Sequence, residues 1–298
     1  MLGNAGNKTD SAALIRARYG VYLALSALSL LLNGTFLIVI CKSWKFVKRR
    51  RITYHVTNLA LADSIVGAST FSHYIAILAA DGEDTAVSSA FTTITWTAST
   101  SSLLAVCLMA IERAVCFKKP HTWNQIVPLK RVLVVMAVNW VVTLALAILL
   151  HFYQLAMMFT VLVLLYFPIF ITVVVYTNIC VQMWMVKSNQ VNEDVATTGR
   201  NSLKQRKIGS FVLILALILL VTMAPSCLTL AVKMTCELFE LNCTFIETVN
   251  MLTHYFYMLE ITNFIVNPIL YVWRVSLYRQ AFWKMFGRVD SESSPHNE

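Results

Sequence analysis

Charged residues are scarce in this sequence. They make up 13% of the 298 residues, whereas a water-soluble domain carries about 25%, and 58% of the residues are hydrophobic. Seven cysteines are too few for a fold held together by disulfides. The first nineteen residues, Met1–Tyr19, hold no long apolar core, so no cleavable secretory signal is expected. These absences exclude an ordinary soluble domain and favour a membrane protein.

Long uncharged runs are present instead. One bilayer crossing needs ~20 apolar residues. The run Val132–Val186 is far longer than this, so it should hold two helices with a reversal near His151–Gln154. The sequence therefore predicts an all-α membrane protein, a seven-transmembrane helix bundle, with runs at Tyr19–Cys41, Ile52–Ala80, Thr85–Ile111, Val132–Val186, Ile208–Val232 and Thr248–Trp273.

The basic residues predict the orientation. Lys42–Arg51 holds six of them, and further clusters follow the third, fifth and seventh helices. Since Lys and Arg gather on the cytoplasmic side, the N-terminus should lie outside and the C-terminus inside. The net charge of +9 then reflects topology and attraction to anionic membrane lipid rather than nucleic-acid binding. We expect an extracellular N-terminus over 1–18, a membrane domain over 19–273, a short amphipathic eighth helix over 274–287, and a disordered cytoplasmic tail over 288–298.

The predicted outer side carries two further signals. Asn7 and Asn242 each begin a glycosylation sequon. Cys236 and Cys243 flank a short outer loop in an oxidising compartment, which favours a local disulfide. Both agree with a multi-pass protein of the plasma membrane.

The third run has the features of a central helix. Thr95, Ser99, Ser102 and Arg113 recur at helical spacing on one face, and small hydroxyl residues allow neighbouring helices to approach closely. Glu112 and Arg113 end this run together.

Motifs on successive helices resemble the rhodopsin-like (class A) G-protein-coupled receptors from end to end. They are Asn58-Leu-Ala-Leu-Ala-Asp63, Glu112-Arg113-Ala114, Trp140, Pro168 with Tyr176, Pro225, and Asn267-Pro-Ile-Leu-Tyr271, with Asn33 as the first-helix mark. The resemblance implies a receptor that binds an extracellular ligand and activates heterotrimeric G proteins, with arrestin and a receptor kinase as further partners. It implies roles in coupling and activation for Glu112, Arg113, Tyr176, Pro225, Asn267, Pro268 and Tyr271.

The sequence also departs from that family. Met223 stands where the family has tryptophan, and Ser88 stands where it has the cysteine that opens the third helix. A very short second outer loop and a cysteine pair in the third resemble the melanocortin, adenosine, cannabinoid and lysophospholipid receptors. The stretch Ser202–Lys207 holds no acid that could pair with Arg113. Our hypothesis is therefore high basal activity; a ligand-independent, constitutively active receptor is an alternative.

Two buried acids have competing interpretations. Asp63, Ser102, Asn263 and Asn267 match the family's sodium pocket; alternatively, Asp63 is protonated and bonded to the asparagines. Glu260 is either a structural, protonated residue or the counter-charge for a polar or cationic ligand. By matched position, the ligand cavity would be lined by His73, Thr95, Trp96, Ser99, Met223, Cys227, Tyr257 and Glu260.

Other function classes fit less well. The seventh run has no lysine, which excludes a retinal Schiff base. No nucleophile–base or metal-ligand spacing appears in the loops, so we expect neither an enzyme nor a cofactor other than an allosteric sodium ion. A seven-helix transporter or proton pathway using Asp63 and Glu260 is the rival class, although the sequence lacks visible symmetry between its halves.

Overall fold

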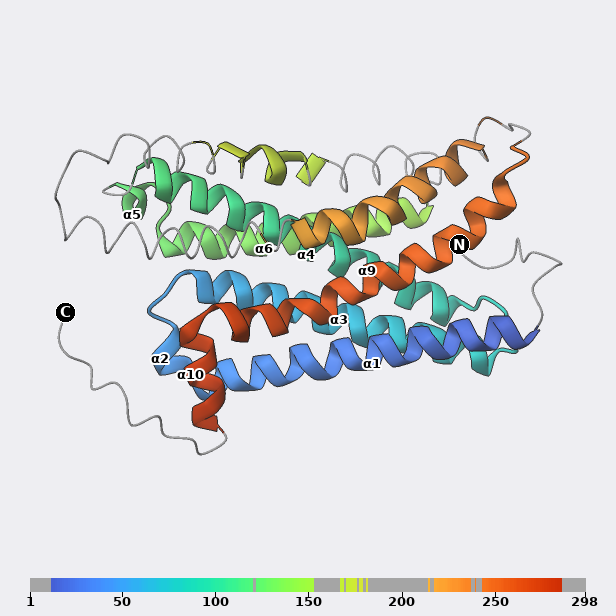
Figure 1. Cartoon of the computed structure of the whole chain (residues 1–298), viewed down its shortest axis with the longest axis horizontal. Coiled ribbons are helices and arrows are strands. Elements are labelled where there is room, and N and C mark those ends of the chain that lie inside the picture. The colour runs from blue at the N-terminus through green and yellow to red at the C-terminus, as the bar shows by residue number, and fades with distance from the viewer. Residues whose placement is uncertain are drawn as a thin grey trace.

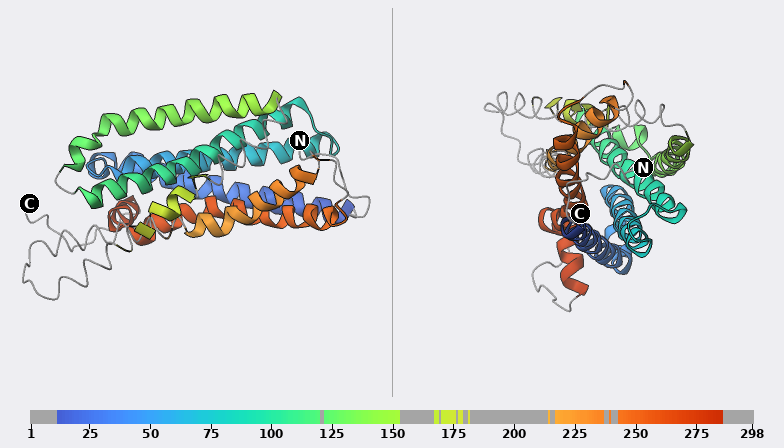
Figure 2. Two further views of the ribbon diagram at one scale, coloured as in Figure 1. Left: turned by 90° about the horizontal axis from the view of Figure 1, so that it is seen from above. Right: turned by 90° about the vertical axis from the view of Figure 1, so that its right-hand side faces the viewer.

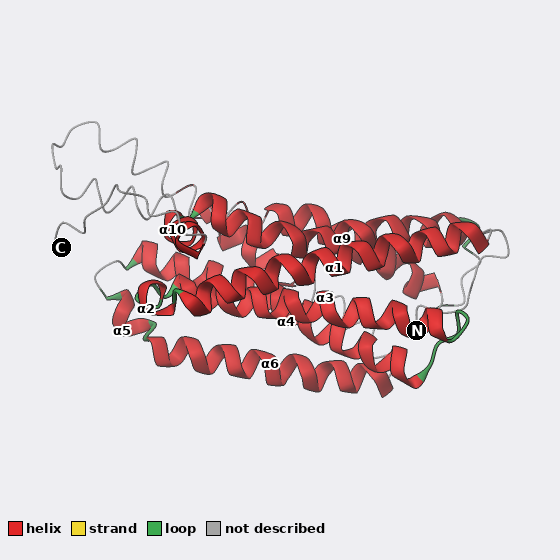
Figure 3. Ribbon diagram, turned by 90° about the horizontal axis from the view of Figure 1, so that it is seen from below, coloured by secondary structure: helices red, strands yellow, loops and turns green. Residues whose placement is uncertain are grey.

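The computed structural model describes residues 12–119, 122–152, 167–168, 170–175, 177–178, 181, 214, 217–236, 239 and 243–285. Within these residues every regular element is a helix (Figure 3). The long helices run side by side along the molecule (Figures 1 and 2). The long helices are α1 (Ala12–Lys42), α3 (Ile52–Ala79), α4 (Ala86–Lys118), α6 (Leu129–Phe152), α9 (Ile246–Arg274) and a further helix over Leu217–Cys236, which carries no label in Figure 1. The short helices are α2 (Trp44–Val47), α5 (Trp123–Ile126) and α10 (Ser276–Met285).

Five described helices are long and apolar enough to cross a membrane: α1, α3, α4, α6 and Leu217–Cys236. The 29-residue α9 runs beside α1, and the described residues between 167 and 181 are helical. α6 ends at Phe152, within the stretch where the sequence analysis places the reversal. The prediction of an all-α membrane protein is confirmed.

α4 lies at the centre of the bundle. In the most apolar 18-residue stretch of α4, 67% is buried, against 28% in the corresponding stretch of α6. α4 packs against both α3 and α6. α6 instead exposes large apolar side chains such as Val138 and Val141. An exposed apolar surface of this kind fits contact with lipid.

The start of α4 explains why a serine occupies position 88. The Thr85 backbone N–H donates to Ser88 Oγ (2.9 Å), and the Ser88 backbone N–H donates to Thr85 Oγ1 (3.1 Å). This reciprocal capping box satisfies two backbone donors that would otherwise lack partners at the helix end. Ser88 is therefore part of the capping box at the start of α4, with Thr85 as the N-cap residue.

Helix ends differ from the boundaries expected from apolar runs. α1 begins at Ala12, so the expected boundary between residues 18 and 19 falls inside it. α4 continues to Lys118, past the end of its uncharged run at Ile111. A helix can continue through polar flanks because each added residue gains a backbone hydrogen bond without a new nucleation cost.

α10 turns away from the axis of α9 at the end of the bundle that holds α2 and α5 (Figure 1), which we call the inner end after the predicted orientation. The Tyr278 hydroxyl donates to Thr53 Oγ1 (3.2 Å). Burial raises the pKa of Tyr278, so this hydroxyl keeps its proton at physiological pH. Lys284 Nζ lies 4.5 Å from the centre of the Phe46 ring on α2. These contacts fasten the amphipathic helix to α2 and to the start of α3.

Candidate functional site

The middle of the bundle holds a buried carboxylate. Ser102 Oγ donates to Asp63 Oδ1 (2.7 Å), and Asn267 Nδ2 donates to Asp63 Oδ2 (2.7 Å). The three residues come from α4, α3 and α9, and each is at most 3% exposed. Three of the four residues expected around a sodium ion are thus brought together. Asn263 is also buried, but no hydrogen bond joins it to Asp63.

Other motif residues meet between helices. Trp140 Nε1 donates to Asn58 Oδ1 (2.9 Å), which joins α6 to α3. Asn139 Nδ2 donates to Ser101 Oγ (2.8 Å), which joins α6 to α4. Inter-helix hydrogen bonds of this kind fix the rotation of membrane helices, whose apolar faces do not distinguish one side from another.

Glu260, halfway along α9, is bonded to the helix Leu217–Cys236. Ser226 Oγ donates to Glu260 Oε2 (2.6 Å), and Glu260 is partly buried. Sequence reasoning did not identify Ser226. A signal was available, because Ser226 lies between Met223 and Cys227, two residues expected to line the ligand cavity.

Two other expected cavity residues bond to neighbouring helices. His73 Nδ1 lies 3.0 Å from the Ser88 carbonyl oxygen and 3.2 Å from Thr92 Oγ1. Since a carbonyl can only accept, Nδ1 carries the proton. Thr95 Oγ1 lies 2.8 Å from Ser69 Oγ. Both side chains therefore hold α3 against α4.

The remaining expected cavity residues lie in packed surroundings. Met223 and Cys227 are at most 4% exposed and belong to the main apolar core, against which Trp96 packs. Ser99 is buried as well. Tyr257 packs edge-on against Tyr22, with ring centres 5.3 Å apart. A ligand that reaches these side chains would have to displace existing packing.

At the inner end, Glu112 contacts two basic side chains. Arg113 Nη2 donates to Glu112 Oε1 (2.6 Å), and His55 Nε2 is bonded to Glu112 Oε2. The side chains of Glu112 and His55 are 3% and 5% exposed. Both oxygens of a desolvated carboxylate thus have partners, as burial requires. Sequence reasoning predicted the Glu112–Arg113 pair but missed His55, although His55 shares a helical face with Leu59 and Asp63.

Trp123 of α5 was also missed. Arg51 Cζ lies 4.3 Å from the centre of the Trp123 ring, and Arg113 Cζ lies 5.8 Å from it. Arg51 Nη1 also donates to the carbonyl of Val127. The sequence places Trp123 in a polar loop without periodicity, so no spacing signal marks it.

The other expected activation residues are only partly described. Tyr271 is fully buried, with its ring 5.1 Å from that of Phe36. Pro225 and Pro268 lie inside helices, the first in Leu217–Cys236 and the second in α9. Tyr176 and the stretch Ser202–Lys207 lie outside the described residues.

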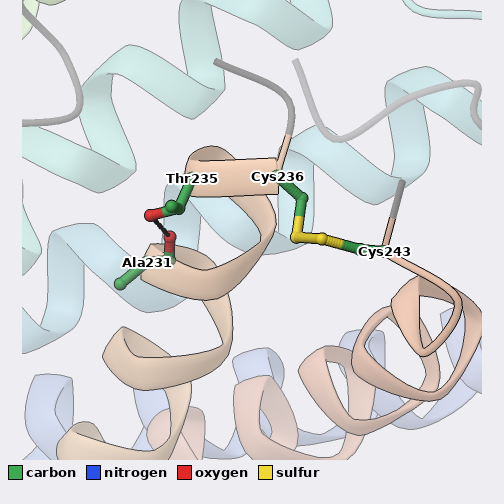
Figure 4. Close-up of a disulfide and its surroundings, with 4 residues drawn as sticks. All are labelled: Ala231, Thr235, Cys236 and Cys243. Atoms are coloured by element: carbon green, nitrogen blue, oxygen red, sulfur yellow. Dashed lines mark hydrogen bonds between the residues drawn. A yellow bond between two sulfur atoms is a disulfide. The ribbon is translucent and has the colours of Figure 1, made fainter. Parts of the chain in front are cut away.

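Cys236 and Cys243 form a disulfide, as the sequence favours (Figure 4). It joins the last residue of the Leu217–Cys236 helix to the segment that precedes α9. The sequon residues Asn7 and Asn242 lie outside the described residues, so glycosylation stays a prediction.

The charged and polar residues of the site form three groups. Glu260 is bonded to Ser226; Asp63 is bonded to Ser102 and Asn267 at the middle level, where Ser102 lies halfway along α4; and Arg113 lies with Glu112 and His55 at the inner level, where α4 ends. Among the described residues, no group of three His, Cys, Asp or Glu side chains is placed to hold a metal ion. Arg113 is bonded to Glu112 of its own helix, whereas Asp63, Glu260 and Glu112 are bonded to residues of neighbouring helices. Such bonds are suited to holding helices in one of two packings.

Comparison with known proteins finds a family match for part of the chain. No curated protein matches the chain. Residues 32–159 match the model of a family described as 7 transmembrane receptor (rhodopsin family). The matched region runs from the second half of α1 to just beyond α6, and it contains Asp63, Ser102, Glu112 and Arg113. Over these residues the chain is therefore similar to the rhodopsin family of seven-transmembrane receptors.

Proposed function

We propose that this protein is a plasma-membrane receptor, with its N-terminus outside, that binds an extracellular ligand and activates a heterotrimeric G protein. The observation that carries the proposal is the nearly buried Arg113 at the inner end of α4, paired with Glu112 within a segment similar to rhodopsin-family receptors. Nucleotide exchange follows from binding the G protein, so the receptor does no covalent chemistry. Arrestin and a receptor kinase are further proposed partners.

The test is nucleotide exchange in lipid. The purified chain is reconstituted into bilayers containing anionic lipid, and GDP release is measured from a panel of heterotrimers. We expect acceleration by the wild type and its loss in Arg113→Ala. Lys119→Ala removes an exposed positive charge nearby and should leave exchange unchanged. A wild type that accelerates no heterotrimer, with or without candidate ligands, contradicts the proposal.

Glu260 points to a polar or cationic ligand. Its Oε2 accepts from Ser226, while the residue stays partly exposed. A carboxylate in this position can attract an ammonium or guanidinium group. Glu260→Gln should abolish the response to an agonist found by screening, whereas Glu247→Gln, an exposed glutamate on the same helix, should preserve it. If Glu260→Gln responds to the agonist as the wild type does at equal surface expression, Glu260 is a structural residue and does not contact the ligand.

We propose that a sodium ion binds at Asp63 and Ser102, at the middle level of the bundle. Asp63 and Ser102 offer carboxylate and hydroxyl oxygens, which are the ligands that hard cations prefer. A bound cation would neutralise the buried carboxylate and thereby stabilise the present packing. Asn267 meets Asp63 through its nitrogen, so Asp63 and Ser102 are the first ligands to test.

The loop pattern supports a position near the melanocortin, adenosine, cannabinoid and lysophospholipid receptors. The support is the Cys236–Cys243 disulfide within the third outer loop, together with a serine cap in place of the cysteine that opens the third helix.

A further inference from the structure

The positive charge of Arg113 is almost removed from water. Its side chain is 12% exposed, and among the described residues its only hydrogen bond goes from Nη2 to Glu112 Oε1. Within the part of the chain that the structure describes, the buried Arg113 Nε has no hydrogen-bond partner. A guanidinium has five N–H donors, so this arginine is held by few bonds for a buried cation. Its position must depend on the residues that hold Glu112 and cover the guanidinium.

His55 determines where the Glu112 carboxylate points. His55 Nε2 occupies Oε2, which leaves Oε1 for Arg113. His55 comes from α3, whereas both partners come from α4, so this contact also ties the inner ends of the two helices. Without the imidazole, the carboxylate would lose its fixed orientation and the second of its two hydrogen bonds.

Trp123 covers the same guanidinium from the loop side. The electron-rich face of an indole attracts cations within ~6 Å of its centre, and Arg113 and Arg51 both lie in that range. Arg51 also donates to the carbonyl of Val127, which follows α5 directly, so it anchors the helix that carries the ring. The aromatic ring thus allows two arginines to gather where their charges alone would repel.

We propose that His55 and Trp123 are positioning residues that hold Arg113 in the non-signalling arrangement. They supply a restraint on Arg113 in a sequence whose stretch Ser202–Lys207 holds no acid to pair with it. Activation then requires α5 to move as well as the helices, because the Trp123 ring has to leave Arg113. This proposal rests on the proposed receptor function only for the effect of the restraint on signalling. The restraint itself can be measured without a G protein.

Cys116 supplies that independent measurement. It lies one turn beyond Glu112 and Arg113 on α4, within electrostatic range of both and of Arg51, and it is 7% exposed. Cys107, on the same helix and equally buried, is an internal reference. The alkylation rate of each thiol is measured by peptide mass spectrometry on the full chain in lipid. The rate at Cys116 relative to that at Cys107 reports how far the bundle opens at its inner end relative to its middle.

The variants separate the restraint from general instability. We expect His55→Ala and Trp123→Leu to raise Cys116 alkylation relative to Cys107, and to raise ligand-independent exchange by about tenfold and about two- to fivefold, respectively. His55→Gln keeps an N–H donor and Trp123→Phe keeps an aromatic face, so both should stay near the wild type. Trp283→Leu, which alters an exposed tryptophan of α10, is the matched control.

Each outcome decides one of the two proposals. Faster Cys116 alkylation in His55→Ala and Trp123→Leu without any nucleotide exchange upholds the restraint and contradicts the receptor function. Exchange by the wild type, with alkylation and basal exchange unchanged in both variants, overturns the restraint and leaves the receptor function standing. If His55→Ala fails to fold, Trp123→Leu in the loop decides the same question.

Discussion

A single side chain, Asn33, compensates for the bond that Pro268 cannot make. Proline has no N–H, so the Phe264 carbonyl, four residues earlier in α9, loses its helical partner. Asn33 Nδ2 from α1 donates to that carbonyl (2.8 Å) and to the Ser29 carbonyl (3.0 Å). Asn33 is fully buried. Pro268 is therefore tolerated inside α9 because a neighbouring helix satisfies the backbone oxygen that it leaves without a donor.

Asn33→Ala should lower the free energy of unfolding by about 1–2 kcal/mol, because the Phe264 carbonyl is left without a donor in a buried place. The measurement is thermal unfolding of the purified chain in lipid nanodiscs. Asn178 donates in the same way to the Val174 carbonyl of its own helix but is exposed, so Asn178→Ala should change stability by less than about 0.5 kcal/mol. Equal losses in the two variants would contradict this account.

At the scale of elements, α1 and α3 approach so closely that one position needs glycine. A Cβ on Gly67 would lie 2.8 Å from the Leu30 backbone nitrogen and 2.9 Å from the Ser26 carbonyl oxygen. Backbone atoms cannot turn aside as a side chain can, so the two helices would have to separate. Close approach through small residues is the usual way in which membrane helices gain packing energy.

Gly67→Ala should therefore destabilise the α1–α3 pair by about 1–3 kcal/mol, as overpacking does. Gly34 is the matched position, because a Cβ there meets nothing within 4 Å. Gly34→Ala should be neutral or slightly stabilising, since alanine favours helix. Unfolding temperatures of the two variants in the same lipid give the comparison, and a loss in Gly34→Ala equal to that in Gly67→Ala would show that helix packing is not the cause.

The elements show what sequence reasoning can reach. Asp63, Ser102 and Asn267 could be grouped in advance because they match the sodium pocket of the receptors that the sequence resembles. His55 and Glu112 lie 57 residues apart in the sequence, and their contact depends on how α3 and α4 are rotated. The spacing of polar residues indicates which face of a helix is buried, but not which residue of the neighbouring helix each side chain meets. Trp123 contacts Arg113 through a loop, whose path no pattern predicts.

At the scale of the whole molecule, α4 connects the middle level to the inner one. Ser102 and Arg113 are eleven residues apart on one continuous helix, which corresponds to about 16 Å. A change in what Asp63 binds can therefore move the inner end through a rigid rod. In such a linkage, a ligand that prefers one packing shifts the population towards it.

Replacing potassium with sodium at constant ionic strength should raise the unfolding temperature of the wild type, because a ligand of the folded state stabilises it. The same exchange should leave Asp63→Asn unaffected, since that variant lacks the charge that holds the cation. Asp84→Asn, an exposed outer acid, should respond like the wild type. A wild type that responds equally to both cations would favour the alternative in which Asp63 is only hydrogen-bonded.

The Cys236–Cys243 disulfide has a mechanical consequence. It holds two Cα atoms 6.2 Å apart where the Leu217–Cys236 helix ends and the segment leading into α9 begins. Two helices linked at one end cannot slide past each other or separate at that end; they can only pivot about the disulfide. A small displacement near the joint is then magnified with distance from it, and the widest gap opens at the far ends of the two helices.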